Sequence, residues 1–194
     1  MILAFIILCG GIYNISDPQE KNFSEEEIKE VATSFHDWYI EYLKDFDSRS
    51  KESYASSLVQ VVEGKDGKSR LTLENYVDKL EDLGTISQKF IEKERLRVAE
   101  CSQFLSTVDW EDFQKAEGYE YDEKCGFFYH YYWLRSQEMP DKVKAFNVEK
   151  KDNHWSVCLK FLNIRDGKEY LGSSYQPKVK VEDINGVLKI TDIK

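Results

Sequence analysis

The side chains best suited to proton-transfer chemistry are the three histidines, His36, His130 and His154. Imidazole changes its charge near neutral pH, which makes histidine the commonest general acid or base in enzymes. His36 directly precedes Asp37, and consecutive side chains on a helix point about 100 degrees apart, so these two do not form a natural catalytic dyad. The simpler interpretation of each histidine is a structural residue that is exposed or hydrogen-bonded. His130 lies within FFYHYYW, residues 127–133, where it could donate a hydrogen bond in a pocket lined by Tyr129, Tyr131 and Tyr132.

The sequence lacks the spacings typical of metal, nucleotide or acyl-transfer sites. No two histidines are four residues apart, as on a metal-binding helix, and no GxSxG elbow occurs. Gly64 and Gly67 lie among acids and lysines in a predicted loop rather than in a phosphate-binding turn. Asp37 and Asp78 fall on predicted helices, where we expect both to face solvent. We therefore expect no metal and no cofactor.

The aromatic side chains favour binding over catalysis. The chain contains 12 Tyr, 11 Phe and 4 Trp, and aromatic rings supply contact area in ligand pockets and interfaces at small entropic cost. The alternative is that they simply form the core. If they line a cavity between a helix and a sheet, the candidate ligand-binding residues are Trp38, Tyr39, Tyr42, His130, Tyr132 and Trp155.

Three helices are predicted in the first half of the chain. The longest covers residues 24–46, because Ser24 and Glu27 have capping-box spacing and the apolar residues that follow form one stripe. A second helix begins at the cap Thr72 and ends at Gly84, and a third runs from the cap Thr85 to about Ala99. The later surface of the third helix is predicted to be solvated, since it carries Glu92, Lys93, Glu94, Arg95 and Arg97.

Two short stretches connect or follow these helices. Residues 58–62 form a short apolar run that fits either a small strand or more helix, and residues 63–68 form a loop. No regular element is predicted over residues 101–122, where Trp110, Phe113, Tyr119 and Tyr121 are expected to hold the segment against the body. In residues 127–133 aromatic enrichment favours a strand over a helix.

Residues 143–193 predict an antiparallel meander. Apolar runs are separated by Asp152-Asn153, Asp166-Gly167 and Asn185-Gly186, dipeptides that tolerate the positive φ of tight hairpin turns. Alternation puts one apolar face inward, formed by Trp155, Val157, Leu159 and Phe161. The predicted fold class is therefore α+β, with N-terminal helices packed on one face of a curved C-terminal antiparallel sheet. Residues 23–194 form the single domain, after a signal-like segment and tether over residues 1–22.

The first eight residues, MILAFIIL, are apolar and are followed by Cys9. They are too few to span a bilayer but suit the hydrophobic part of a secretory signal. Cys9 resembles the lipidated cysteine of a bacterial lipoprotein, although Leu8 stands where that motif has a small residue. We predict export to the periplasm or cell surface with a lipid anchor at Cys9; the alternatives are a cleaved signal or a buried apolar strand. The basic leader of a signal is missing, which leaves the true translation start open.

Three further cysteines, Cys101, Cys125 and Cys158, have no two-residue spacing of a zinc or redox site. In an exported protein, Cys101 and Cys125 could form a disulfide that closes a loop, and this pairing stays open. Cys158 falls within a predicted strand and is expected to be a buried, small apolar residue.

The net charge of -9 argues against a nucleic-acid partner, because phosphate contacts need clustered Lys and Arg.

The order of elements resembles a known architecture. A helix carrying FHDWYIEYL, then YVDKLEDLGTISQKFI, then strands ending in INGVLKITDI resemble an uncharacterised group of secreted bacterial domains with the cystatin-like fold of the nuclear-transport-factor-2-like superfamily. The resemblance implies a long helix in the curve of the sheet, able to enclose a pocket. Leu188 stands where such a final strand often carries Trp, which thins one wall of that pocket.

The same superfamily includes isomerases, dehydratases and many non-enzymatic binders, so the fold does not decide the function. Its enzymes set an Asp or His in an apolar cone, which would make His130 or Asp37 the acid–base residue of a lyase or isomerase. We favour a non-catalytic envelope or secreted module that binds a small molecule or a protein partner. An immunity-type protein that blocks a basic toxin is a further alternative, and a dimer is compatible with each of these functions.

Overall fold

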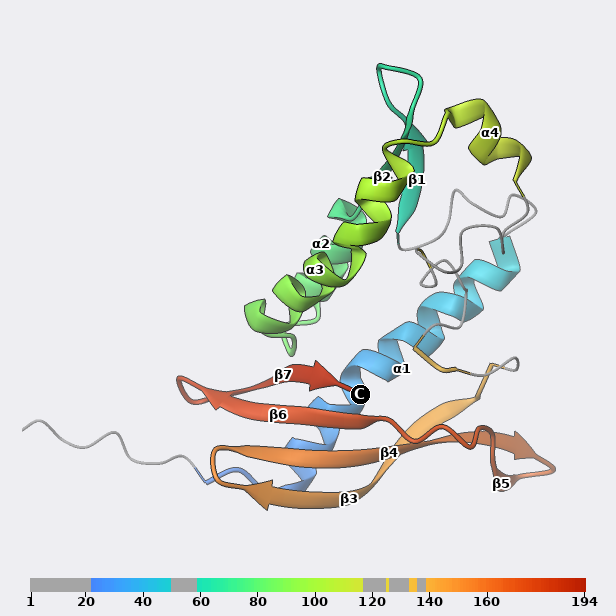
Figure 1. The fold of residues 1–194 in the computed structure, drawn as a ribbon. Coiled ribbons are helices and arrows are strands. Elements are labelled where there is room, and N and C mark those ends of the chain that lie inside the picture. Colours follow the sequence, from blue (N-terminus) through green and yellow to red (C-terminus); the bar gives the residue numbers. More distant parts are fainter. Residues whose placement is uncertain (1–21, 50–58, 117–124, 126–132, 136–138) are drawn as a thin grey trace, which may run out of the picture.

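The computed structural model describes residues 22–49, 59–116, 125, 133–135 and 139–194. Helices and short strands come first and a sheet closes the chain, which confirms the α+β class (Figure 1). The first half contains α1 (Glu25–Arg49), β1 (Gln60–Glu63), β2 (Ser69–Thr72), α2 (Glu74–Asp82), α3 (Gln88–Leu105) and α4 (Trp110–Lys115). The sheet contains β3 (Lys142–Lys151), β4 (His154–Arg165), β5 (Lys168–Leu171), β6 (Lys178–Ile184) and β7 (Val187–Ile193).

The C-terminal sheet is antiparallel, in the order β3-β4-β6-β7, with β5 pairing with the far end of β4. Trp155 lies opposite Val181 and Val157 lies opposite Val179, so the side chains predicted to face inward share one side of the sheet. Val157, Leu159 and Phe161 are fully buried on that side. The alternation of apolar and polar residues therefore predicted the inner face correctly.

Two of the three predicted hairpin turns use positive φ angles. Asp166 and Gly167 have φ of 51° and 72°, and Asn185 and Gly186 have φ of 56° and 81°. The third turn differs, because neither Asp152 nor Asn153 adopts a positive φ. Asp and Asn also fit the common turn types with negative φ, so this dipeptide does not specify one turn conformation.

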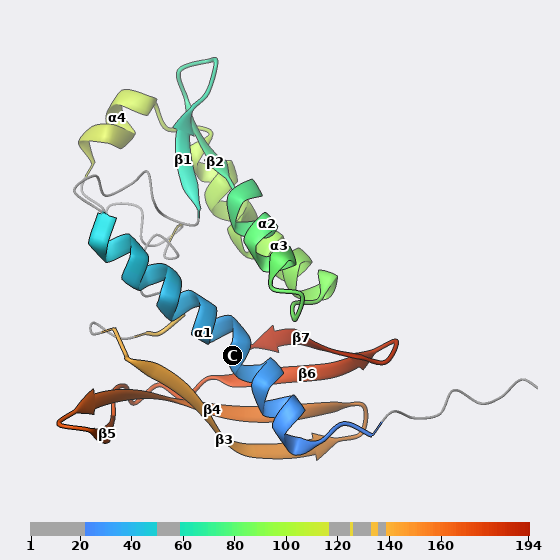
Figure 2. The same ribbon diagram turned by 180° about the vertical axis from the view of Figure 1, so that it is seen from behind.

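Helix α1 lies across the inner face of the sheet. It passes behind the strands in Figure 1 and in front of them in Figure 2. The predicted capping box forms at its start: the Ser24 backbone N–H donates to Glu27 Oε2 at 2.8 Å, and the Glu27 N–H donates to Ser24 Oγ at 3.2 Å. The helix runs to Arg49, slightly beyond the predicted end at residue 46.

The second and third helices begin at residues other than the predicted caps. The N-cap of α2 is Leu73 rather than Thr72, and it has no side-chain cap. The cap of α3 is Ser87 rather than Thr85, because Ser87 Oγ accepts from the Phe90 N–H at 3.1 Å. The Thr85 carbonyl instead accepts from the Ile190 N–H at 2.7 Å, which joins the start of α3 to strand β7.

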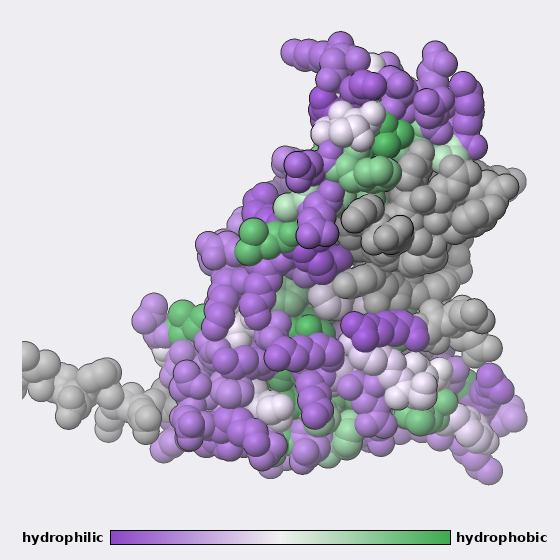
Figure 3. Space-filling view, viewed as in Figure 1, coloured by the Kyte–Doolittle hydropathy of each residue, from purple (hydrophilic) through white to green (hydrophobic). Residues whose placement is uncertain are grey.

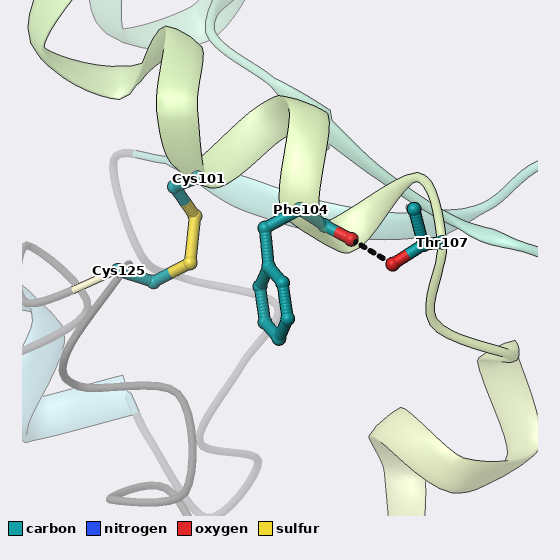
Figure 4. The surroundings of a disulfide bond; sticks show 4 residues. All are labelled: Cys101, Phe104, Thr107 and Cys125. Carbon is teal, nitrogen blue, oxygen red and sulfur yellow. Dashed lines mark hydrogen bonds between the residues drawn. A yellow bond between two sulfur atoms is a disulfide. The ribbon is translucent and has the colours of Figure 1, made fainter.

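Helix α3 also extends to Leu105, well past the predicted end at Ala99. Its buried stripe continues through Cys101 and Leu105, which form a second small core with Cys125. Cys101 and Cys125 are joined by a disulfide (Figure 4). Beside it, the Phe104 carbonyl accepts a hydrogen bond from the Thr107 hydroxyl at 2.8 Å, which closes the end of the helix.

The apolar run that fitted either a small strand or more helix contains strand β1. This strand pairs with β2 as a separate antiparallel hairpin. Segment 101–122, for which no regular element was predicted, contains the end of α3 and the short helix α4. The strand predicted over residues 127–133 lies outside the described residues except for Trp133. The signal-like segment and tether over residues 1–22 lies outside them except for Asn22. No helix in the described part of the chain is long and apolar enough to cross a membrane.

Candidate functional site

His36 is a core residue in this structure. Its imidazole is fully buried on α1, between the rings of Phe35 and Phe161, with ring centroids 5.2 and 5.4 Å away. Neither ring nitrogen makes a hydrogen bond of good geometry with the described residues. Burial lowers the pKa of His36 to about 3, and the nearby Trp133 backbone opposes this shift only in part. The ring is therefore neutral at physiological pH and has no access to solvent.

The two predicted solvent-facing aspartates, Asp37 and Asp78, are indeed exposed. Partial burial raises the pKa of the Asp37 carboxyl, the Thr33 hydroxyl lowers it by hydrogen bonding, and the charge of Glu41 raises it. Asp37 points away from the core face of α1, so it lies outside any pocket between helix and sheet. His130 and Tyr132 lie outside the described residues, as does Cys9.

The candidate aromatic residues fall into two groups rather than one. Trp38 and Tyr42 pack together on α1 with ring centroids 5.9 Å apart, and Tyr39 is stacked on Phe35 at 6.1 Å. Trp155 instead meets Phe23 edge-on at 6.0 Å, at the beginning of α1. A helix rises by 1.5 Å per residue, so about 20 Å of α1 separates the two groups.

The junction between α1 and the sheet is tightly packed where the structure describes it. Ala32, Phe35 and His36 on the helix are 0% exposed, as are the facing sheet residues Val157, Leu159 and Phe161. A space large enough for water beside these side chains would expose part of their surface. Of the described candidates, Tyr39 belongs to the buried core, while Trp38, Tyr42 and Trp155 are partly buried and pack against it.

A buried polar cluster joins α2 to α3. Glu94 is only 4% exposed and accepts from the Tyr76 hydroxyl at 3.0 Å and from two Arg97 nitrogens at 3.1 and 2.6 Å. The Arg97 guanidinium also lies over the Trp133 ring, 5.5 Å from its centroid. Burial and the Glu94 charge raise the pKa of Tyr76 well above its usual value. The prediction that Glu94 is solvated was wrong, because its partner Tyr76 comes from another helix.

The described residues form a groove away from the helix–sheet junction, between β1 and α4. It has a volume of about 620 Å³. Val61 and Val62 form its strand side, while Trp110 and Phe113 form its helix side, their rings stacked 5.7 Å apart. Figure 3 shows hydrophobic surface over the β1–β2 hairpin, bordered by hydrophilic side chains. The remaining lining residues are Gln60, Glu63 and Gln114.

Backbone contacts hold α4 beside the hairpin. The Ser69 N–H donates to the Val108 carbonyl at 2.9 Å, and the Trp110 N–H donates to the Gly67 carbonyl at 2.9 Å. The Lys68 ammonium pairs with Asp109 at 2.9 Å across the same contact. Below the groove, Val61 and Phe113 pack on the small core of Cys101, Leu105 and Cys125, so the disulfide supports the groove.

Sequence reasoning did not find this groove. Trp110 and Phe113 were expected to hold their segment against the body, and β1 was one of two interpretations of an apolar run. No local signal shows that two segments so far apart in the chain face each other. Among the described residues, no group of three or more His, Cys, Asp or Glu side chains is close enough to hold a metal ion.

No protein-family model matches this sequence, and no curated protein or solved structure is detectably similar to it.

Proposed function

We propose that this protein is a non-catalytic binding module of the cell envelope whose partner occupies the groove between β1 and α4. The observation that carries the proposal is the groove itself. Its volume of about 620 Å³ falls within the range of natural ligand sites, and aromatic and aliphatic side chains line most of it. Tryptophan and phenylalanine are also enriched at protein interfaces.

The exposed apolar atoms in the groove are a reason to expect an occupant. Val62 is 40% exposed, and Trp110 and Phe113 are partly exposed. Removing such surface from water is favourable by roughly 25 cal/mol per Å², from which the entropic cost of association is subtracted. Because the hairpin and α4 are fixed by backbone hydrogen bonds and by the small disulfide core, little ordering entropy is lost when a partner binds.

Export is part of the same proposal. The disulfide between Cys101 and Cys125 favours an oxidising compartment, and the apolar run before Cys9 suits a lipoprotein signal. Two acyl chains on Cys9 would anchor the protein stably. We expect Cys9→Ser to move the protein from the membrane fraction to the soluble fraction of fractionated cells, and unchanged partitioning would contradict the anchor.

The cystatin-like resemblance agrees with a binding role, since that superfamily contains many non-enzymatic binders. A second candidate function, an immunity-type protein that blocks a basic toxin, is favoured by the carboxylates beside the groove, Glu63, Asp109, Glu111 and Asp112. Both candidates use the same groove and differ in the partner.

The groove can be tested with Nile red, a neutral dye whose emission rises in apolar surroundings. We expect the wild-type protein to enhance the emission and Val62→Glu or Trp110→Ala to reduce this enhancement several-fold. Leu96→Glu is the matched control, because Leu96 is 74% exposed on α3 and does not line the groove. Circular dichroism melts check that each variant is folded. Equal emission from wild type and both groove variants would overturn the proposal.

A further inference from the structure

We infer that the groove takes an extended peptide segment of a partner protein that combines apolar side chains with lysine or arginine. The inference rests on the proposed function and adds the chemistry of the partner. Four consecutive residues of β1, from Gln60 to Glu63, line the groove. A strand rises by about 3.3 Å per residue, so this wall is about 13 Å long. A wall of this length matches about four residues of extended peptide.

The groove continues into a second hollow of about 330 Å³, and the two share Glu63 and Trp110. The second hollow is lined by Gly67, Asp109, Glu111 and Asp112 in addition. Among the described residues, no lysine or arginine lines either hollow. The site thus has an apolar floor and one border made of carboxylates.

These carboxylates are only partly neutralised by the protein. Asp109 pairs with Lys68 at 2.9 Å, and Glu111 with Lys115 at 3.6 Å, where both side chains are largely exposed. Glu63 and Asp112 have no ion-pair partner in the part of the chain that the structure describes. Exposed pairs contribute little, so the ammonium or guanidinium group of a ligand can compete for this border.

The charge of the whole chain acts in the same direction. Its net charge of -9 attracts cationic partners over long distances and repels anionic ones. Complementary charge mainly sets specificity and association rate, while the apolar floor supplies most of the affinity. Changes to the carboxylates should therefore alter specificity and association rate, whereas changes to the apolar floor should alter affinity.

The test uses three fluorescein-labelled hexapeptides in which three leucines alternate with three lysines, three glutamines or three glutamates. Fluorescence anisotropy with the full chain measures each affinity at low and at physiological salt. We expect the lysine peptide to bind about tenfold or more tightly than the glutamate peptide at low salt, with the glutamine peptide between them. Added salt should weaken only the binding of the lysine peptide.

Variants separate the two parts of the site. The double variant Glu63→Gln with Asp112→Asn should weaken the lysine peptide about fivefold or more and reduce its salt dependence, while Asp109 and Glu111 keep part of it. Glu92→Gln with Glu100→Gln removes two exposed carboxylates of α3 and is the matched control for net charge. Trp110→Ala should weaken all three peptides and the dye.

Any other result would overturn the inference, and one of them would overturn the proposed function as well. Equal affinity for the lysine and glutamate peptides, or an equal loss in the α3 control variant, would overturn the inference but leave the groove as a binding site. Dye binding without binding of any peptide would do the same. Absence of both dye and peptide binding would overturn the proposed function as well.

Discussion

The imidazole of His36 packs against the ring of Phe161 with centroids 5.4 Å apart and planes inclined at 63°. The contact joins the middle of α1 to the central strand β4, and both side chains are 0% exposed. A histidine in this setting is a core residue that carries a titratable group. Folding therefore requires it to be neutral, which gives the fold a dependence on pH.

The stability should fall in mild acid because of His36. Burial lowers its folded-state pKa to about 3, below the ordinary value of 6.5. Below pH 6.5 the unfolded chain binds a proton that the folded chain does not, so the free energy of unfolding decreases by roughly 1.4 kcal/mol per pH unit. Between pH 7.5 and 5.0 we expect a loss of about 2 kcal/mol in urea unfolding.

The variant His36→Leu isolates this effect, because it removes the titrating group and keeps an apolar side chain in the core. Its free energy of unfolding should be nearly constant between pH 7.5 and 5.0. Below pH 5 the carboxylates begin to titrate, so the comparison is limited to the higher range. If the variant lost as much stability as the wild type, His36 would not be the cause.

The buried Glu94 should matter far more for stability than its exposed neighbour Glu92. Glu94→Ala leaves the buried Tyr76 hydroxyl and the partly exposed Arg97 guanidinium without their shared acceptor. Breaking one side of a buried charged cluster costs about 3 kcal/mol or more. Urea unfolding should show this loss, whereas Glu92→Ala should change the stability by less than about 0.5 kcal/mol. Similar small effects in both variants would contradict the cluster's structural role.

Elements specified by local rules could be predicted from the sequence. The capping box of Ser24 and Glu27 marked the start of α1, and alternation along β4 marked its inner face. The other features of the fold depend on contacts between segments that are far apart in the sequence. Thr85 and Ser87 are both good helix caps, but the Thr85 hydroxyl is hydrogen-bonded to the Ser34 hydroxyl of α1 at 2.7 Å, whereas Ser87 Oγ accepts from the Phe90 N–H.

The candidate site shows the same division. The sequence correctly suggested aromatic side chains on α1, but it could not show whether they enclose a hollow or fill it. Ala32 and Phe35 on the helix and Val157 and Leu159 on the sheet are all 0% exposed, and such close packing is a property of the folded structure. The groove between Val62 and Trp110 depends on a contact between segments that carry no shared local pattern.

The tight turn at Asn185 and Gly186 should be sensitive to a side chain at Gly186. Gly186 has a φ of 81°, and no atom lies within 4 Å of the position that an alanine Cβ would take, so only backbone strain opposes alanine. We expect Gly186→Ala to cost about 1–2 kcal/mol in urea unfolding. Asn153→Ala is the control in the β3–β4 turn, which has no positive φ, and should cost clearly less. Equal costs in the two turns would refute this reasoning.

The disulfide between Cys101 and Cys125 should stabilise both the fold and the groove. It closes a loop with a sequence separation of 24 residues, for which loop entropy predicts about 3–4 kcal/mol. Replacing both cysteines by serine should lower the free energy of unfolding by about that amount and weaken Nile red binding, because Val61 and Phe113 pack on the same small core.

Cys158→Ser is the control, since this free thiol is half-buried on β4 and lies outside that core. Wild type treated with dithiothreitol should behave like the double serine variant, while the double variant should not respond to the reductant. Full retention of dye binding in the reduced wild type would show that the groove does not depend on the disulfide.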